Sequence, residues 1–428
     1  MSEIQQDALP TAPEWLEAAV ADELANTIAL RRHFHAEPEL GNQETKTRDY
    51  IAAELRKYGV DEVVTGFGEA HTAVIGVLNP GKGHAVGLRA DIDALPVKEN
   101  TGLPFASCAR GTMWGRETDV SHMCGHDMHI AMLLSAARIL AAHKEDVPRT
   151  VVFVFQPAEE GDSIENPFER ETRKLSGGRA LVEGGLIEQY GIEEMFGIHV
   201  MARVPTGTMQ IVPGTALNSI DTFEIEIEGV QAHGAMPWTG VDATLVAAET
   251  VIALQQLVAR NIDLTRGMGV ITIGKLVAGE TANVMAGKAS MLGTMRTNDM
   301  AIRERMLERL PQVVEGTALA SGAKASVRIA DSYPVTVNNA ELARESIQVL
   351  RRFGVDAVEI EKGVGASEDF SYYAQKVPSV YMFLGTDPEG VESAPNNHSD
   401  MFNPDESAMA AGVRAHIASV MRPVVTKA

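Results

Sequence analysis

The sequence is poor in cysteine, short of positive charge and without a long apolar run. Only Cys108 and Cys124 occur among 428 residues, which favours a reducing compartment. The formal net charge of -21, from 37 basic and 58 acidic residues, disfavours nucleic acid and anionic membranes as partners. The acidic N-terminus has no basic leader, and no run approaches a membrane span. We therefore expect a cytoplasmic protein that acts on a small molecule.

Apolar strands alternate with helix-period segments over much of the chain, and 428 residues exceed what one core usually supports. This alternation predicts an α/β fold with a mostly parallel sheet. The expected strands are 73–78, 85–90, 150–155, 195–200 and 379–385. The expected helices are 16–35, 44–58, 130–143, 178–190, 340–353 and 406–421.

The middle of the chain has a different pattern. In TFEIEIEG, Phe223, Ile225 and Ile227 alternate with glutamates, which is typical of a half-exposed antiparallel strand. A helix near 241–260, two strands, a helix interrupted at Pro311 and a last strand follow. This order predicts an inserted βαββαβ, ferredoxin-like domain at 216–331. The larger domain would then consist of 1–215 and 332–428.

Cys124 and His126, in the stretch MCGHDMH, are candidate metal ligands. Residues two apart diverge on a helix, so we expect them on a turn that leads into the apolar helix from Ile130. Thiolate and imidazole suit Zn, Mn, Co or Ni. A buried structural cysteine beside a capping histidine is the alternative for this motif alone.

Two glutamates and a histidine follow predicted strands. Glu159 and Glu160 come after TVVFVFQP, and His199 closes GIHV. Open α/β folds place their ligands at the carboxyl edge of the sheet. One glutamate could bind a metal while the other acts as a base for an activated water, which is hydrolytic chemistry. A solvated acidic loop is the alternative for the glutamates.

Two further polar positions could complete such a site. Asp91 closes the predicted strand GLRAD and is a candidate for orienting a metal ligand, whereas Asp93 could simply cap the following turn. His398 lies in the polar loop NNHSDMF after the last strand. Alone it would be an ordinary surface histidine, but a multi-ligand site draws on distant segments.

Six motifs, in order, resemble the M20 metallopeptidase family: RADIDALPVKENTGLPFAS, CGHD, QPAEEG, GIHV, ASEDFSYY and NNHSDMF. The similarity is to its amidohydrolase and aminoacylase subfamily, which contains hippurate hydrolases and indoleacetyl-amino-acid hydrolases. It spans nearly the whole chain. The resemblance implies a metallopeptidase catalytic domain, with the ferredoxin-like insertion serving as a lid and dimerisation domain.

The resemblance also implies roles for single residues. One or two divalent ions would be bound by Cys124, His126, Glu160, His199 and His398, with Cys124 bridging. Glu159 would be the general base, and His233 would reach across a homodimer to stabilise the oxyanion. Asn283 and Arg296 would lie on the substrate side, and Glu368 would line that side or orient metal ligands. The implied reaction is hydrolysis of an N-acyl amino acid or related small amide by a metal-activated water.

The sequence departs from the family pattern in three places. The connection ASCARGTMWGRETDVSH before the CGHD motif is longer than usual, GVQAH replaces a double-glycine form, and NVMAGKAS lacks the usual proline and acidic residue. These differences keep two alternatives open. One is hydrolytic deamination of an aromatic amine, as in 5-nitroanthranilate aminohydrolase. The other is a catalytically inactive binding protein on the same fold.

Overall fold

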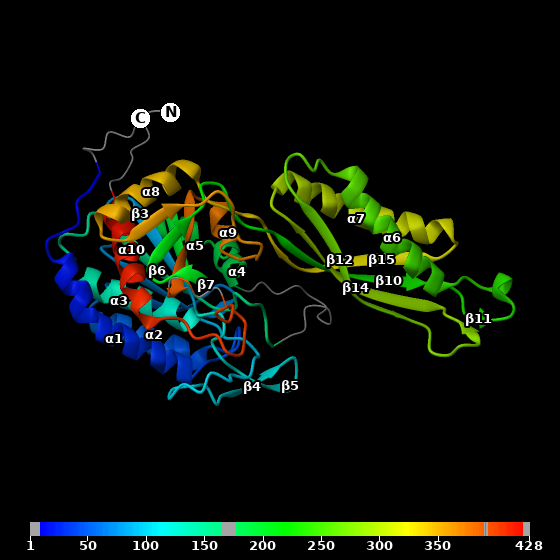
Figure 1. Ribbon diagram of the computed structural model, residues 1–428, viewed down its shortest axis with the longest axis horizontal. Helices are drawn as coiled ribbons and strands as arrows, with labels where there is room; N and C mark the ends of the chain where they lie inside the picture. Colours follow the sequence, from blue (N-terminus) through cyan, green and yellow to red (C-terminus); the bar gives the residue numbers. More distant parts are fainter. Residues whose placement is uncertain (1–8, 165–176, 389, 391–392, 423–428) are drawn as a thin grey trace.

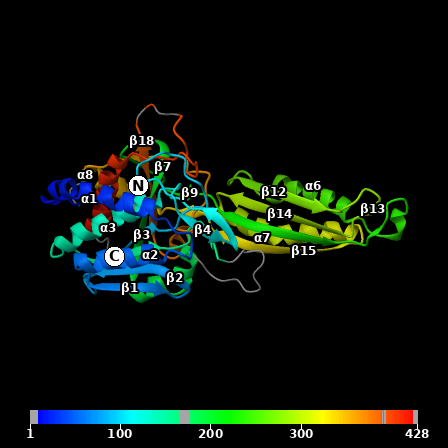
Figure 2. The same cartoon turned by 90° about the horizontal axis from the view of Figure 1, so that it is seen from below.

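The structure is a computed structural model that describes residues 9–164, 177–388, 390 and 393–422 (Figure 1). Part of the acidic N-terminus therefore lies outside the described residues. The chain forms two units side by side, one built on an eight-stranded sheet and one on a four-stranded sheet (Figures 1 and 2). We call them the larger unit and the smaller unit. None of the described helices is long and apolar enough to cross a membrane.

The sheet of the larger unit is mixed, with a parallel centre. Its strands, in spatial order, are β1 (Glu62–Phe67), β2 (Ala70–Leu78), β6 (Thr150–Gln156), β3 (Ala85–Asp91), β7 (Ile192–Pro205), β18 (Ser379–Asp387), β8 (Thr208–Ile211) and β17 (Asp356–Glu359). The four central strands β6, β3, β7 and β18 are parallel to one another. The predicted α/β class with a mostly parallel sheet is confirmed.

Helices cover both faces of this sheet because alternate strand residues point to opposite sides. In β6, Val151 and Phe153 belong to one hydrophobic cluster and Val152 and Val154 to the other. The first face carries α1 (Leu16–Ala36), α2 (Thr45–Tyr58), α3 (His126–Ala142), α8 (Ala340–Arg352) and α10 (Met409–Met421), which follows η3 (Glu406–Ala408). The second carries α4 (Gly177–Glu183), α5 (Leu186–Tyr190) and α9 (Ser371–Ala374).

The smaller unit has the predicted ferredoxin-like order. Its antiparallel sheet runs β12 (Gly269–Ala278), β14 (Lys288–Thr297), β10 (Ile220–Glu228), β15 (Lys324–Tyr333), and it packs against α6 (Ala243–Asn261) and α7 (Met300–Ala320). Phe223, Ile225 and Ile227 are buried, as the alternation in TFEIEIEG predicts. The exact domain limits 216–331 stay a prediction.

Short paired strands complete the chain. They are β4 (Arg110–Met113) with β5 (Arg116–Asp119), β9 (Thr215–Leu217) with β16 (Thr336–Val337), and β11 (Ala232–His233) with β13 (Val284–Met285), while η2 (Pro237–Thr239) follows β11. The β9–β16 pair lies in the larger unit where the chain leaves for the smaller unit and returns from it.

Two predicted helices differ from the structure. Helix α7 runs through Pro311 without a break, so the predicted interruption is wrong. Buried residues before and after the proline, including Leu310 and Val314, pack against the sheet and hold the helix despite the missing N–H. The single helix predicted at 178–190 is two helices, because Gly185 takes a left-handed φ of 89° between them.

Candidate metal centre

Five side chains from four segments of the larger unit meet at the carboxyl edge of the parallel strands. The Cys124 Sγ lies 3.3 Å from His199 Nε2 and 3.2 Å from His398 Nε2. The His398 Nε2 lies 3.2 Å from Glu160 Oε1. The five are Cys124, His126, Glu160, His199 and His398, the ligand set that the family resemblance implies.

These side chains form two groups that share one member. The first consists of Cys124, His126 and His199, and the second of Cys124, Glu160 and His398, with the ligand atoms of each group within 4.8 Å of one another. A thiolate can bind two metal ions at once, so this arrangement fits two neighbouring divalent ions with Cys124 between them. Sulfur, nitrogen and carboxylate oxygen together suit transition metals.

The turn before α3 places Cys124 and His126. His126 is the first residue of the helix, four residues earlier than the sequence predicts, and Gly125 before it has a φ of 101°. A β-carbon at Gly125 would collide with Val200 Cγ2. Glycine is therefore required for the turn that brings Cys124 against the strand that carries His199.

The imidazole rings are oriented by their second nitrogens. The His126 Nδ1 lies 2.9 Å from the carbonyl oxygen of Asp93, and the His199 Nδ1 lies 2.7 Å from that of Val200. Each Nδ1–H donates there, which leaves each Nε2 lone pair free for a metal. Among the described residues, the buried His126 Nε2 has no hydrogen-bond partner.

His199 lies within β7 and not at its end. The pairing of β7 with β3 stops at Gly197, whereas its pairing with β18 continues to Pro205. His199 is therefore just beyond the edge of β3, which opens the space for its ring. The sequence could not show this, because GIHVMARVP is one extended run.

Acidic side chains lie close together at this centre. Burial, together with Glu368 and Glu160, raises the pKa of Glu159 well above its ordinary value. Burial, together with Glu160 and Glu159, likewise raises the pKa of the Cys124 thiol. A divalent ion would compensate this charge and favour the thiolate, so the residues present fit bound metal.

A third possible group, Asp91, His126 and His129, is less suited to a metal. The His129 Nδ1 lies 2.5 Å from Asp91 Oδ1, and its Nε2 accepts the Val200 N–H at 2.9 Å. Both ring nitrogens are thus in use, and His129 supports the strand beside His199. Our sequence reasoning missed His129, although its spacing of three from His126 places the two on one helix face. The orienting role of Asp91 stays a prediction.

Glu368 and Asp369 lie near the centre in a second cluster, which we call the compensated cluster because the protein supplies a cation within it, Arg89. Arg89, which is buried, donates to Asp91 Oδ2 at 2.6 Å, to Glu368 Oε1 at 2.8 Å and to Asp369 Oδ1 at 2.9 Å. The Tyr381 hydroxyl donates to Glu368 Oε2 at 2.5 Å. Both oxygens of Glu368 are bound by protein groups, and its carboxylate lies within 4.8 Å of those of Glu159 and Asp369. A contact between Glu368 and substrate stays a prediction.

The loop that carries Glu159 and Glu160 has left-handed backbone at both ends. Ala158 has a φ of 51° and Gly161 a φ of 104°. The Ala158 N–H donates to Glu44 Oε1, and the Glu160 N–H to Asp93 Oδ2, each at 2.9 Å. These contacts hold the Glu159 Oε2 4.0 Å from His126 Nε2.

The long connection before Cys124 forms the β4–β5 hairpin, which contacts this loop. Trp114, at the hairpin tip, has a φ of 50° and is 42% exposed. Its backbone N–H donates to the Ser163 carbonyl and its Nε1 to the Asp162 carbonyl, each at 2.9 Å. The hairpin therefore lies beside the segment that follows Glu160.

The three predicted residues of the smaller unit are not together. Arg296 lies near the larger unit, where its Nη1 donates to Ser367 Oγ at 3.1 Å. His233 pairs with Val284 and is exposed at the distal end of the smaller unit, and the Asn283 carbonyl accepts the Gly234 N–H there (Figure 1). Within one chain, His233 and Asn283 do not reach the Cys124 centre.

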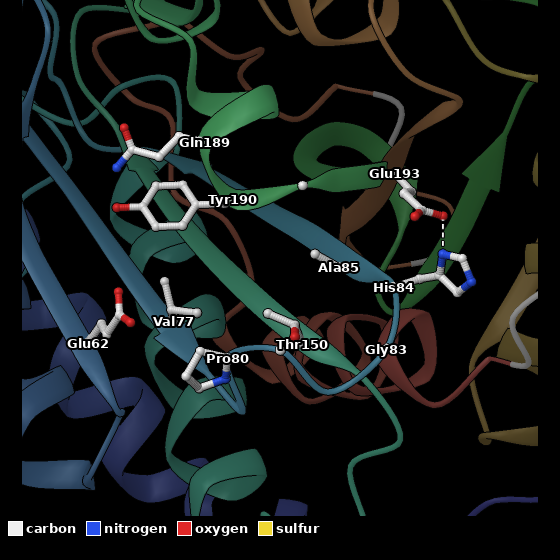
Figure 3. A pocket seen from close by; sticks show the side chains of 12 residues that line it. Glu62, Val77, Pro80, Gly83, His84, Ala85, Thr150, Gln189, Tyr190 and Glu193 are labelled. Atoms are coloured by element: carbon white, nitrogen blue, oxygen red, sulfur yellow. Dashed lines mark ion pairs between the residues drawn. The ribbon is translucent and has the colours of Figure 1, made fainter.

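A cavity of about 660 Å³ lies at the opposite, amino-terminal edge of the parallel strands (Figure 3). Its lining includes Ala85 at the start of β3, Tyr190 and an ion pair between His84 and Glu193. None of the candidate site residues lines this cavity. It is therefore separate from the candidate metal centre.

Comparisons with known proteins agree with this geometry. The sequence profile of Peptidase family M20/M25/M40 matches residues 87–422. Thermostable carboxypeptidase 1 of Saccharolobus solfataricus is 36% identical, over 91% of this chain and 93% of its own length. IAA-amino acid hydrolase ILR1-like 2 of Arabidopsis thaliana is 32% identical, over 99% and 91%.

A solved structure is also similar. The crystal structure of the Bacillus subtilis YXEP protein, described as a dinuclear metal binding peptidase from the M20 family, superposes with a TM-score of 0.75 at 28% identity. The match covers 94% of this chain and 98% of that one. The resemblance seen in the sequence motifs is thereby confirmed. This chain belongs to the M20 metallopeptidase family and is a metal-dependent hydrolase of that family.

Proposed function

We propose that this hydrolase cleaves the amide bond of an N-acyl amino acid or a related small amide. The observation that carries the proposal is the position of Glu159, a buried carboxyl with a raised pKa, beside five converging metal ligands. Divalent ions held by Cys124, His126, Glu160, His199 and His398 would supply Lewis acidity for the carbonyl group and for the attacking water.

Glu159 is suited to move a proton between water and the leaving nitrogen. Its carboxyl is 6% exposed, and burial beside Glu368 and Glu160 raises its pKa, which strengthens the carboxylate as a proton acceptor. It would accept a proton as the water attacks the carbonyl carbon and donate that proton to the nitrogen as the C–N bond breaks. The relatives named as a carboxypeptidase and an amino acid hydrolase support this reaction class.

Arg296 is our candidate for binding the substrate carboxylate. It comes from β14 and reaches Ser367, two residues before Asp369. A planar guanidinium can bind a carboxylate through two parallel hydrogen bonds. This position would orient the amino acid portion of the substrate toward the metal centre.

A homodimer would account for the remote position of His233. Strand β12 is an edge of the smaller sheet, and it exposes Val270, Leu276 and Val277. An unpaired edge with exposed apolar residues can extend its sheet with a second copy. In such a dimer, His233 of one subunit would stabilise the oxyanion in the other.

Subunit complementation tests this arrangement. Glu159→Gln and His233→Ala are each expected to be nearly inactive as homodimers. Random exchange of subunits should restore about a quarter of wild-type activity, because half of the dimers are mixed and each has one intact site. A mixture that stays inactive although mass spectrometry shows mixed dimers would contradict the role of His233.

Hydrolytic deamination of an aromatic amine is the second candidate. The β4–β5 hairpin, with Trp114 half-exposed beside the loop that carries Glu160, supports it because this hairpin changes the surroundings of the site. The complete ligand set argues against the third reading, an inactive binding protein.

One screen separates the candidates. Metal-free protein is reconstituted with Mn, Zn, Co or Ni and given N-acyl amino acids or aromatic amines. Release of amino acids supports amide hydrolysis, whereas release of ammonia from the aromatic amines supports deamination. Absence of both activities in protein with full metal occupancy would contradict the proposed chemistry.

A further inference from the structure

Tyr333 lies where the chain returns from the smaller unit to the larger one. It is the last residue of β15 and pairs with Ile220, the first residue of β10. The next pair, Ser332 with Asp221, lies one step into the smaller sheet. Tyr333 is therefore at an end of that sheet, and its hydrogen bond to Glu159 shows that this end faces the larger unit.

The strand end before Tyr333 is fixed to the smaller unit. Arg303 of α7 donates to Asp221 from Nε at 2.9 Å and from Nη2 at 2.7 Å, and its Nη2 also lies 2.6 Å from Ser332 Oγ. The side chains of Arg303 and Asp221 are 13% and 1% exposed, so this ion pair is shielded from water. Ser332 will therefore move with α7 and the smaller sheet.

The Tyr333 side chain, in contrast, binds the larger unit. Its hydroxyl donates to the carbonyl oxygen of Glu159 at 2.7 Å. The neighbouring residues Ala158 and Gly161 have left-handed backbone, which needs support from surrounding contacts when the residue is not glycine. The supports from Glu44 and Asp93 come from the larger unit, whereas Tyr333 ties the same loop to the smaller unit.

We propose that Tyr333 is a positioning residue for Glu159. It couples the orientation of the smaller unit to the placement of the general base. The hydroxyl binds the backbone carbonyl and not the carboxyl, so Tyr333 acts through Glu159 and does not transfer the proton itself. This inference rests on the role of Glu159 in the proposed function.

The test compares Tyr333→Phe with Tyr372→Phe. Tyr372 is a matched control because its ring packs edge-on against Tyr333, whereas its hydroxyl donates to the Ser332 carbonyl and not to the Glu159 carbonyl. Loss of the Tyr333 hydroxyl should lower kcat about tenfold, the effect of one hydrogen bond of about 1.4 kcal/mol, with KM and metal content within about twofold. Tyr372→Phe should retain wild-type kcat.

Hydrogen exchange gives a measurement that does not need a substrate. The Glu160 N–H donates to Asp93, and the Gly161 N–H to the Ala158 carbonyl. In metal-loaded protein, Tyr333→Phe should speed exchange of these two amides, and Tyr372→Phe should not. Unchanged exchange in Tyr333→Phe, or equal loss of kcat in both variants, would overturn the proposal. If the chain cleaves no amide, the exchange result still decides whether Tyr333 holds the loop.

Discussion

Two neighbouring clusters of buried ionisable groups differ in how their charge is balanced. In the cluster around Arg89, one guanidinium contacts three carboxylates, and Tyr381 donates a further hydrogen bond. In the cluster around Cys124, thiol, imidazole and carboxylate groups converge, and among the residues that the structure describes no arginine or lysine forms an ion pair with them. From this difference we infer that the cluster around Arg89 supports the fold. The cluster around Cys124 is instead arranged to bind a cation that the protein does not itself supply.

The largest expected effect concerns the base beside the uncompensated cluster. Glu159→Gln should lower kcat by about 10⁴-fold, because the amide cannot accept a proton from water. Metal content should stay at the wild-type level, since both ligand groups that share Cys124 stay complete, although Glu159 also lies within 4.8 Å of His126 and Glu160. Steady-state rates and metal analysis of the same samples check this. Retention of full activity in Glu159→Gln would show that Glu159 does not transfer a proton in the reaction.

The next largest expected effect is a loss of stability when Arg89 is removed from the compensated cluster. Arg89→Leu leaves Asp91, Glu368 and Asp369 buried without their cation, and should destabilise the protein by about 4 kcal/mol in urea unfolding. If this variant does not fold, Arg89→Lys keeps the charge and should show a smaller loss. Wild-type stability of Arg89→Leu would mean that Arg89 does not stabilise the buried carboxylates of its cluster.

A third cluster sharpens the comparison because it contains two cations, Arg31 and His35, of which only His35 can lose its charge near neutral pH. His35 is buried between Asp127, 2.9 Å from Nδ1, and Glu99, 3.1 Å from Nε2. Burial disfavours the charged ring, but the hydrogen bonds that His35 donates to Asp127 and Glu99 outweigh it and raise the pKa of His35 to about 9.

The sign of the pH effect follows from this raised pKa. The unfolded ring has a pKa of about 6.5, so the stabilisation by His35 is fully present below that pH and is lost as the pH rises through about 9. The loss should approach roughly 3 kcal/mol in urea unfolding between pH 6 and pH 10. His35→Gln should remove this part of the pH dependence, and an unchanged pH profile in that variant would refute the assignment.

The smallest expected effect concerns a single hydroxyl in the compensated cluster. Tyr381→Phe removes the hydrogen bond to Glu368 Oε2 and should cost about 1 kcal/mol of stability in urea unfolding. The kcat should stay within about twofold, because Arg89 still neutralises Glu368. A tenfold fall in kcat with unchanged stability would place this cluster in catalysis instead.

The sequence predicted the two units and the ligand set better than the supporting network. Apolar β-branched runs mark the strands, and the ligands stand out because polar groups follow those runs. Arg89 was not predicted, because an arginine within GLRAD gives no sign of burial. Its partners Gln156, Glu368 and Asp369 come from distant segments and meet only in the fold.

Other features of the site were also missed because local sequence patterns do not show contacts between distant segments. His129 was missed because a histidine in an apolar helix resembles an ordinary core residue. The local pattern ASEDFSYY also did not show that Arg89 and Tyr381 bind both oxygens of Glu368. The hydrogen bond from Tyr333 to Glu159 joins residues 174 positions apart, which no local pattern indicates.

The most direct test of the uncompensated cluster is metal stoichiometry. Metal-free wild type and single variants are loaded with Mn²⁺, freed of excess metal and analysed by mass spectrometry for ions per chain. We predict two ions in the wild type, one in His199→Ala, and loss of both in Cys124→Ala, because Cys124 belongs to both ligand groups. Retention of both ions in folded Cys124→Ala would contradict a shared centre built on this cysteine.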